Sequence, residues 1–196
     1  VRALRSAVPD APIFVSTTTL AGRDVARTRL ATEVDGIFYA PVDYCWAVRA
    51  VLRRLRPLLV IVLETEIWPN LFNEAKRSGA ALLVVNGRIS DRALPRYLEF
   101  RWLFQPILAL PDVVLAQSET DANRYIKLGA DGSHVQVAGN LKYDFDVRRV
   151  AIAPDLQSYL HAAESVWVAA STMPPAEPGD PDEDDVVLDA WERIRR

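Results

Sequence analysis

The sequence is poor in cysteine, methionine and histidine, and each scarcity has a consequence. Its 196 residues include one cysteine, Cys45, so no disulfide can form within the chain, which fits a reducing compartment. The only methionine is Met173 and the first residue is Val1, so we expect the sequence to be part of a longer protein. With one cysteine and two histidines, no spacing typical of a metal site is present.

Long hydrophobic runs and an excess of one charge are also missing. No apolar stretch approaches the roughly 18 residues that a membrane-spanning helix needs. The formal net charge is −3, with acidic and basic residues intermixed, so composition does not indicate nucleic-acid binding. Hydrophobic residues, in contrast, make up 50% of the chain, which is ample for a core.

Short apolar runs alternate with longer amphipathic segments along the chain. This alternation predicts an α/β fold with a doubly wound parallel sheet and right-handed crossovers. The expected strands are residues 13–16, 37–40, 59–63, 82–85, 113–116, 135–138 and 166–169. The expected helices are residues 23–33, 44–55, 69–78, 91–110, 119–128 and 155–162, after a first helix, residues 1–8, whose preceding strand is missing.

Two polar stretches interrupt this alternation. Residues 143–154 predict a linker between a first domain, residues 1–150, and the beginning of a second, residues 151–196. The acidic, proline-rich residues 174–185 predict a loop that leads into a final helix, because acidic side chains suit a helix N-terminus.

The most informative segment follows the apolar run at residues 58–63. Glu64 and Glu66 come directly after this run, at the carboxyl end of a predicted strand, where open α/β sheets bind ligands. If the chain stays extended, the two side chains project to the same side. Pro69 is suited to the first turn of a helix. The alternative is that Glu66 caps this helix and that Glu64 is solvated.

Polar residues follow the other predicted strands too. Because the carboxyl ends of parallel strands meet at one edge of a sheet, we expect a polar cleft of mixed charge there. Each residue also has a purely structural alternative, since threonines cap helices and single cations are common on surfaces. The residues are Thr17, Thr18, Thr19, Asp43, Asn86, Arg88, Gln117, Asn140 and Lys142.

Five motifs, in this order, resemble those of the Kdo transferases, the 3-deoxy-D-manno-octulosonic acid transferases of lipopolysaccharide assembly. They are Thr-Thr-Thr-x-x-Gly (17–22), Tyr-x-Pro-x-Asp (39–43), Glu-Thr-Glu-Ile-Trp-Pro-Asn (64–70), Asn-x-Arg-x-Ser (86–90) and Gly-Asn-Leu-Lys-Tyr-Asp (139–144). The resemblance covers residues 1–172. It implies a GT-B fold of two Rossmann-like domains, of which this chain is the N-terminal, acceptor-side half.

The resemblance also implies an activity, the transfer of Kdo from CMP-Kdo to the lipid A precursor (lipid IVA). This reaction inverts the anomeric centre and needs no metal or other cofactor. It implies CMP-Kdo, the lipid A precursor and the inner-membrane surface as partners, no nucleic acid, and a place on the cytoplasmic face of the bacterial inner membrane. Glu64 and Lys142 match family positions that stabilise the transition state. The candidate substrate contacts are Thr17, Thr18, Thr19, Glu66, Asn86, Arg88 and Asn140.

Two departures from the family pattern bear on activity. The family's general base, a glutamate in a Ser-Val-Gly-Glu motif, lies upstream of Val1, and most CMP-binding motifs lie beyond Arg196. Residues 171–175 also replace the family's Ser-Thr-His-x-Gly-Glu. The chain alone is therefore expected to be inactive. The alternatives are a non-catalytic module that binds a glycolipid or phosphosugar, and a fragment that is unstable by itself.

Overall fold

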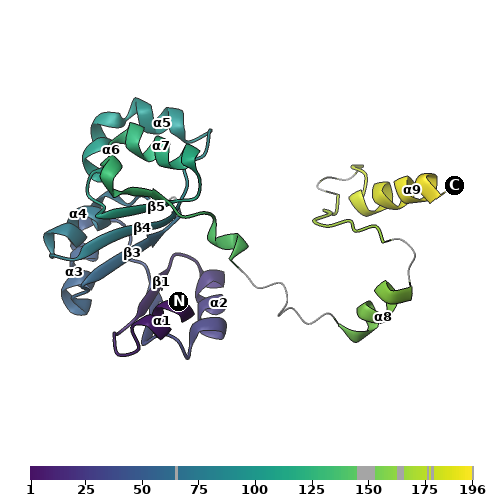
Figure 1. Cartoon of the computed structure of the whole chain (residues 1–196), viewed down its shortest axis with the longest axis horizontal. Helices are drawn as coiled ribbons and strands as arrows, with labels where there is room; N and C mark the ends of the chain where they lie inside the picture. The colour runs from purple at the N-terminus through teal and green to yellow at the C-terminus, as the bar shows by residue number, and fades with distance from the viewer. Residues whose placement is uncertain (65, 145–152, 163–165, 176, 178, 196) are drawn as a thin grey trace. The chain divides into compact units, whose positions relative to one another are not determined.

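The computed structural model describes residues 1–64, 66–144, 153–162, 166–175, 177 and 179–195 (Figure 1). The chain divides into two compact units, Val1–Asp144 and Phe145–Arg196. The first unit contains the strands and the candidate site. The polar stretch predicted as a linker falls largely outside the described residues.

A four-stranded parallel sheet forms the main part of the first unit. Its strands follow one another in chain order, as β3 (Leu59–Leu63), β4 (Ala81–Gly87), β5 (Val113–Ala116) and β6 (Val135–Val137). Helices α4 (Pro69–Arg77) and α7 (Glu119–Leu128) pack against the sheet, α6 (Arg101–Leu108) contacts both of them, and α3 (Cys45–Leu55) packs against α4.

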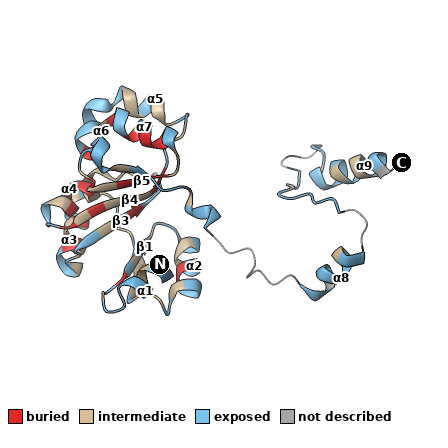
Figure 2. Cartoon of the chain, viewed as in Figure 1, coloured by how far each residue is buried: buried red, intermediate tan, exposed pale blue. Residues whose placement is uncertain are grey.

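The core lies between this sheet and its helices. Alternate strand residues point to opposite faces, so Leu82, Val84 and Val114 share one face and are almost fully buried with Phe72 of α4 and Tyr125 of α7. In Figure 2 these buried segments lie along the strands and on the helices that cover them. Alternate residues of the edge strand β3, in contrast, are exposed.

A second sheet is separate from the first. Strands β1 (Phe14–Thr17) and β2 (Gly36–Tyr39) pair in parallel, α2 (Leu20–Leu30) packs on both, and Arg5 of α1 (Arg2–Ala7) forms an ion pair with Asp35 at 2.6 Å. The predicted α/β fold with parallel strands is confirmed, but the strands divide into two sheets instead of one. No described strand joins β1 or β2 to the larger sheet, so the predicted strand ends belong to two sheets.

Most other elements begin and end within a few residues of the prediction, with two exceptions. The predicted helix 91–110 is divided at Phe100, whose ψ of 29° leaves the helical range, into α5 (Leu94–Glu99) and α6. The predicted strand 166–169 is wrong. The described part of the second unit has two helices, α8 (Pro154–Ala162) and α9 (Glu183–Arg195), and no strand with which residues 166–169 could pair. Trp167 instead stacks on Trp191, with 5.2 Å between the ring centroids.

Candidate functional site

Two neighbouring strands end in an unusual backbone conformation. Glu64, directly after β3, has φ of 61°, and Asn86, near the end of β4, has φ of 59° at a shift in the β4–β5 register. This left-handed conformation is common for glycine and asparagine but costs most other residues, such as glutamate, roughly 1–2 kcal/mol. The N–H of Glu64 donates to the carbonyl of Val85 at 2.9 Å. The chain turns at Glu64, so the extended course considered for Glu64 and Glu66 is wrong.

An open pocket of about 390 Å³ lies at these strand ends. Within it, Glu64 Oε1 and Lys142 Nζ are 3.1 Å apart, and their side chains remain 47% and 68% exposed. The ion pair thus joins a residue that follows β3 to one that follows β6, and it leaves both charges accessible to a ligand. The pocket is lined by Leu63, Glu64, Glu66, Asn86, Leu141 and Lys142.

The loop that carries Lys142 is attached to β4 through Asn86. The Asn86 side chain is buried, and its Oδ1 accepts a hydrogen bond from the N–H of Leu141 at 2.9 Å. The main-chain oxygen of Asn86 accepts a second hydrogen bond, from Gln117 Nε2 at 3.1 Å. Asn140 caps the short 3₁₀ turn Leu141–Tyr143, because its Oδ1 accepts from the N–H of Lys142 at 3.0 Å.

The cap considered for Glu66 is supplied by another residue. Glu66 Oε2 accepts a hydrogen bond from Trp68 Nε1 at 2.5 Å, whereas the first N–H groups of α4 donate to Asp43, from Asn70 at 3.0 Å and from Leu71 at 2.8 Å. A carboxylate at a helix N-terminus is stabilised by both the hydrogen bonds and the helix dipole. Asp43 therefore fixes the helix that follows the glutamate pair. Its signal in the sequence is the aspartate of the Tyr-x-Pro-x-Asp motif.

Arg88 is exposed and does not line the pocket. Its neighbour Ile89 is fully buried, and the N–H of Ile89 donates to Asp121 Oδ1 at 2.9 Å. The guanidinium of Arg124 hydrogen-bonds the carbonyl of Ile89 and the carboxylate of Asp91. Arg88 therefore lies between the end of β4 and a segment that these hydrogen bonds hold in place.

Thr17 is the last residue of β1 in the smaller sheet, Thr18 and Thr19 follow it, and none of the three lines the pocket. Thr19 caps α2, because its Oγ1 accepts from the N–H of Gly22 at 3.0 Å. Thr17 has a buried hydroxyl oxygen without a partner among the described residues. The structure thus brings Glu64, Glu66, Asn86 and Lys142 together, and it places Thr17, Thr18, Thr19 and Arg88 elsewhere on the first unit.

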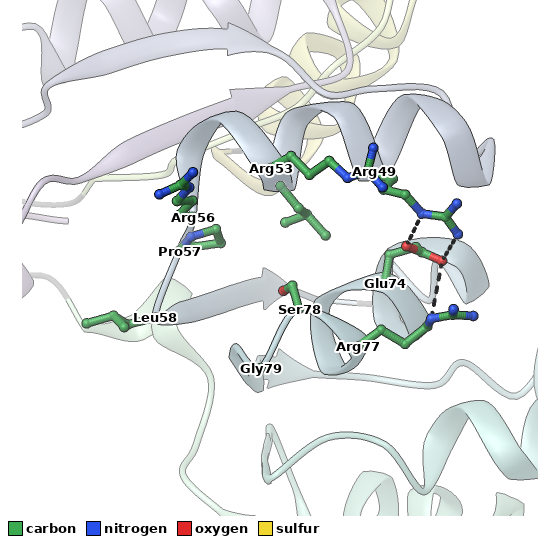
Figure 3. A pocket seen from close by; sticks show the side chains of 10 residues that line it. Arg49, Arg53, Arg56, Pro57, Leu58, Glu74, Arg77, Ser78 and Gly79 are labelled. Carbon is green, nitrogen blue, oxygen red and sulfur yellow. Dashed lines mark hydrogen bonds and ion pairs between the residues drawn. The ribbon is translucent and has the colours of Figure 1, made fainter.

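A second, larger pocket of about 640 Å³ lies at the amino ends of β3 and β4 (Figure 3). Arg49, Arg53, Arg56 and Arg77 line it, and Glu74 is its one carboxylate. Arg49 donates two hydrogen bonds of 2.8 Å to Glu74, from Nε to Oε2 and from Nη2 to Oε1. Arg77 Nε lies 4.0 Å from Glu74 Oε1. We call this region the arginine pocket.

The ion pair between Arg49 and Glu74 in the arginine pocket connects two helices of the fold. The hydrogen bonds from Arg49 and from Cys45 lower the pKa of Glu74 to about 2, against the opposing effect of burial. Cys45 Sγ donates to Glu74 Oε1 at 3.2 Å, and this hydrogen bond to the carboxylate raises the pKa of the thiol. Since Cys45 and Arg49 belong to α3 and Glu74 to α4, the pair fastens one helix to the other.

Two negative findings apply to the part of the chain that the structure describes. No group of three or more histidine, cysteine, aspartate or glutamate side chains is arranged to hold a metal ion there. None of the helices in that part combines the length and the apolar character required to cross a bilayer.

Parallel sheets flanked by helices, with a polar pocket at the strand ends, define a Rossmann-like α/β protein. Two solved structures share this fold. One is a protein from Listeria monocytogenes described as a UDP-N-acetylglucosamine 2-epimerase, with a TM-score of 0.54 and 12% identity over 80% of this chain and 46% of that chain. The other is also a UDP-N-acetylglucosamine 2-epimerase, with a TM-score of 0.52 and 14% identity over 76% and 46%.

Residues 1–145 match the family model of the 3-deoxy-D-manno-octulosonic-acid transferases. The chain belongs to the Kdo transferase family, as the five motifs predicted. A Kdo transferase from Haemophilus influenzae is 28% identical over 176 residues, 88% of this chain and 40% of that protein. A bifunctional glycosyltransferase/methyltransferase from Fusobacterium nucleatum is 33% identical over 162 residues, 81% of this chain and 24% of that protein. The chain thus spans less than half the length of these relatives.

Proposed function

We propose that the whole protein transfers Kdo from CMP-Kdo to the lipid A precursor (lipid IVA) at the cytoplasmic face of the inner membrane. In this proposal residues 1–150 form the acceptor-side domain, and residues 151–196 are the linker and the beginning of the donor domain. Family membership supports the reaction class. The observation that carries the proposal is the accessible ion pair between Glu64 and Lys142, 3.1 Å apart in a pocket at the strand ends.

Glu64 and Lys142 would act on charges of opposite sign that develop during the transfer. A glutamate outside this chain would deprotonate the acceptor hydroxyl. The hydroxyl oxygen would then bond to the anomeric carbon of Kdo while the bond from that carbon to the CMP phosphate breaks, with inversion and without a metal. Glu64 would orient the acceptor or stabilise positive charge at the anomeric carbon, and Lys142 would stabilise the negative charge of the phosphate or carboxylate.

The remaining candidates would contact the substrates. Glu66 lines the same pocket, and Asn140 caps the turn that carries Lys142. Arg88 offers a guanidinium suited to a phosphate or a carboxylate. Thr17, Thr18 and Thr19 would contact the acceptor from the N-terminal end of α2, a position where backbone N–H groups suit anions.

Transfer assays on the complete protein test this proposal. Because each group would stabilise charge that develops in the transition state, Glu64→Ala and Lys142→Ala should each lower the rate of Kdo transfer by roughly 10²–10³-fold. Arg53→Ala, an exposed arginine of the arginine pocket, is the control and should leave the rate unchanged. Near-normal rates for both site variants would overturn the assigned roles.

A non-catalytic binding module is the second candidate for the chain by itself. Within the described residues, both carboxylates of the pocket already have partners, Glu64 with Lys142 and Glu66 with Trp68. Calorimetry of the 196-residue chain with the lipid A precursor should show weak binding. When CMP-Kdo is added as well, the chain should release no CMP. Transfer by the chain alone would show that it carries a base of its own.

A further inference from the structure

We propose that Asn86 is a positioning residue that holds Lys142 opposite Glu64. This inference rests on the proposed role of the Glu64–Lys142 pair and gives Asn86 a different task from direct contact with substrate. Asn86 is 4% exposed, and its side-chain oxygen already accepts a hydrogen bond from the N–H of Leu141. Because Asn86 is buried and its side-chain oxygen bonds the loop, the residue is better suited to hold that loop than to contact a ligand.

The residue type follows from two requirements that meet at this position. The backbone has φ of 59°, a conformation that glycine, asparagine and aspartate adopt most readily. The Leu141 N–H also needs an acceptor that reaches it from β4. Glycine would satisfy the first requirement alone, whereas asparagine satisfies both.

The hydrogen bond acts on Lys142 through its neighbour in the chain. Leu141 and Lys142 are the first two residues of the 3₁₀ turn, so fixing the N–H of one fixes the starting point of the other side chain. An exposed ion pair contributes little to stability and cannot order a loop by itself. The lysine is held near Glu64 mainly because its backbone is attached to β4.

Asn86→Gly and Asn86→Asp separate the side-chain acceptor from the backbone conformation in the 196-residue chain. The readout is the ¹³C resonance of the Glu64 carboxylate and its response to Lys142→Met, which removes an ammonium 3.1 Å away. We expect this response in the parent chain and with Asn86→Asp, and its loss with Asn86→Gly. The Leu141 amide should also exchange about tenfold faster in Asn86→Gly, as expected for one lost hydrogen bond.

Leu141→Pro breaks the same hydrogen bond from the other partner. Position 141 is the first residue of the turn, where proline is tolerated, and Asn140 has the extended backbone that a following proline favours. This variant leaves β4 unchanged, so it still tests the positioning role if Asn86→Gly does not fold. It should also abolish the response of Glu64 to Lys142→Met.

A full response in either Asn86→Gly or Leu141→Pro would overturn the positioning role, and so would loss of the response in Asn86→Asp. The measurement needs no catalysis. If the complete protein proved unable to transfer Kdo while the responses followed this pattern, the proposed function would fail and the positioning of Lys142 would stand.

Discussion

The two pockets lie at opposite ends of β3 and β4, and each contains a carboxylate paired with a cation. In the arginine pocket the Glu74 side chain is 9% exposed and hydrogen-bonded by two residues of α3, whereas the Glu64 side chain is 47% exposed and paired with one lysine. The arginine pocket is the larger and has more charges. Its carboxylate is already satisfied by the protein, so size and charge alone do not identify the site. Exposure of the paired groups is the better guide.

Removing the buried carboxylate should have the largest effect on stability. Glu74→Ala leaves Arg49 without its partner and removes the hydrogen bonds between α3 and α4, so we expect the melting temperature of the chain to fall by roughly 10 °C. Glu64→Ala is the matched control, and because its ion pair is exposed it should change the melting temperature by no more than about 2 °C. Circular dichroism measures both. Similar shifts in melting temperature for the two variants would show that the carboxylates of the two pockets contribute equally to stability.

Acid should remove the same stabilisation gradually. The pKa of Glu74 is about 2 in the folded chain against 4.5 for an unperturbed glutamate, so the unfolded chain takes up this proton first as the pH falls. The contribution of Glu74 is therefore complete above pH 4.5 and decreases between pH 4.5 and pH 2. Asp35 and Asp112 also have lowered pKa values, so the comparison must be with Glu74→Gln.

The measurement is the difference in melting temperature between the parent chain and Glu74→Gln as a function of pH. We expect a constant difference above pH 5 and a steady decrease toward pH 2, where the parent carboxylate also becomes protonated. A difference that stays constant down to pH 2 would contradict the lowered pKa. The control Glu64→Gln reports the behaviour of an exposed carboxylate.

Local pattern was enough to predict the elements and the central part of the site. The predicted strand 59–63 matches β3 at both ends, and the rule that parallel strands share an edge predicted that Glu64 and Lys142 would lie at the same edge, where they are 3.1 Å apart. Both inferences use information within a segment or a property common to all parallel sheets. They do not require knowing which strand pairs with which.

The predictions that failed depend on distant partners. Residues 166–169 have the composition of a strand but find no strand to pair with, and β1 and β2 pair with each other and not with the larger sheet. Thr17, Thr18 and Thr19 were therefore expected at an edge to which they do not belong. The turn at Glu64 had no local signal either, because glutamate is not a residue that favours positive φ.

The smallest expected effect concerns backbone strain at one residue in each of the two pockets. Arg56 in the arginine pocket has φ of 47° and Glu64 has φ of 61°, so glycine should relieve strain at both. Arg56 is the residue that ends α3, a position where glycine is common, and Arg56→Gly should stabilise the chain by about 0.5–1 kcal/mol without changing Kdo transfer in the complete protein.

Glu64→Gly relieves similar strain but also removes an ion pair worth up to about 1 kcal/mol, so stability should stay within about 0.5 kcal/mol of the parent while transfer is lost. Urea unfolding of the chain and transfer assays of the complete protein measure the two effects. If Glu64→Gly were strongly destabilising, the exposed pair would be a structural element like Glu74 and Arg49. A neutral change in stability with lost transfer would mean that a glutamate is kept at this strained position for the reaction, because folding alone gives no reason to keep one there.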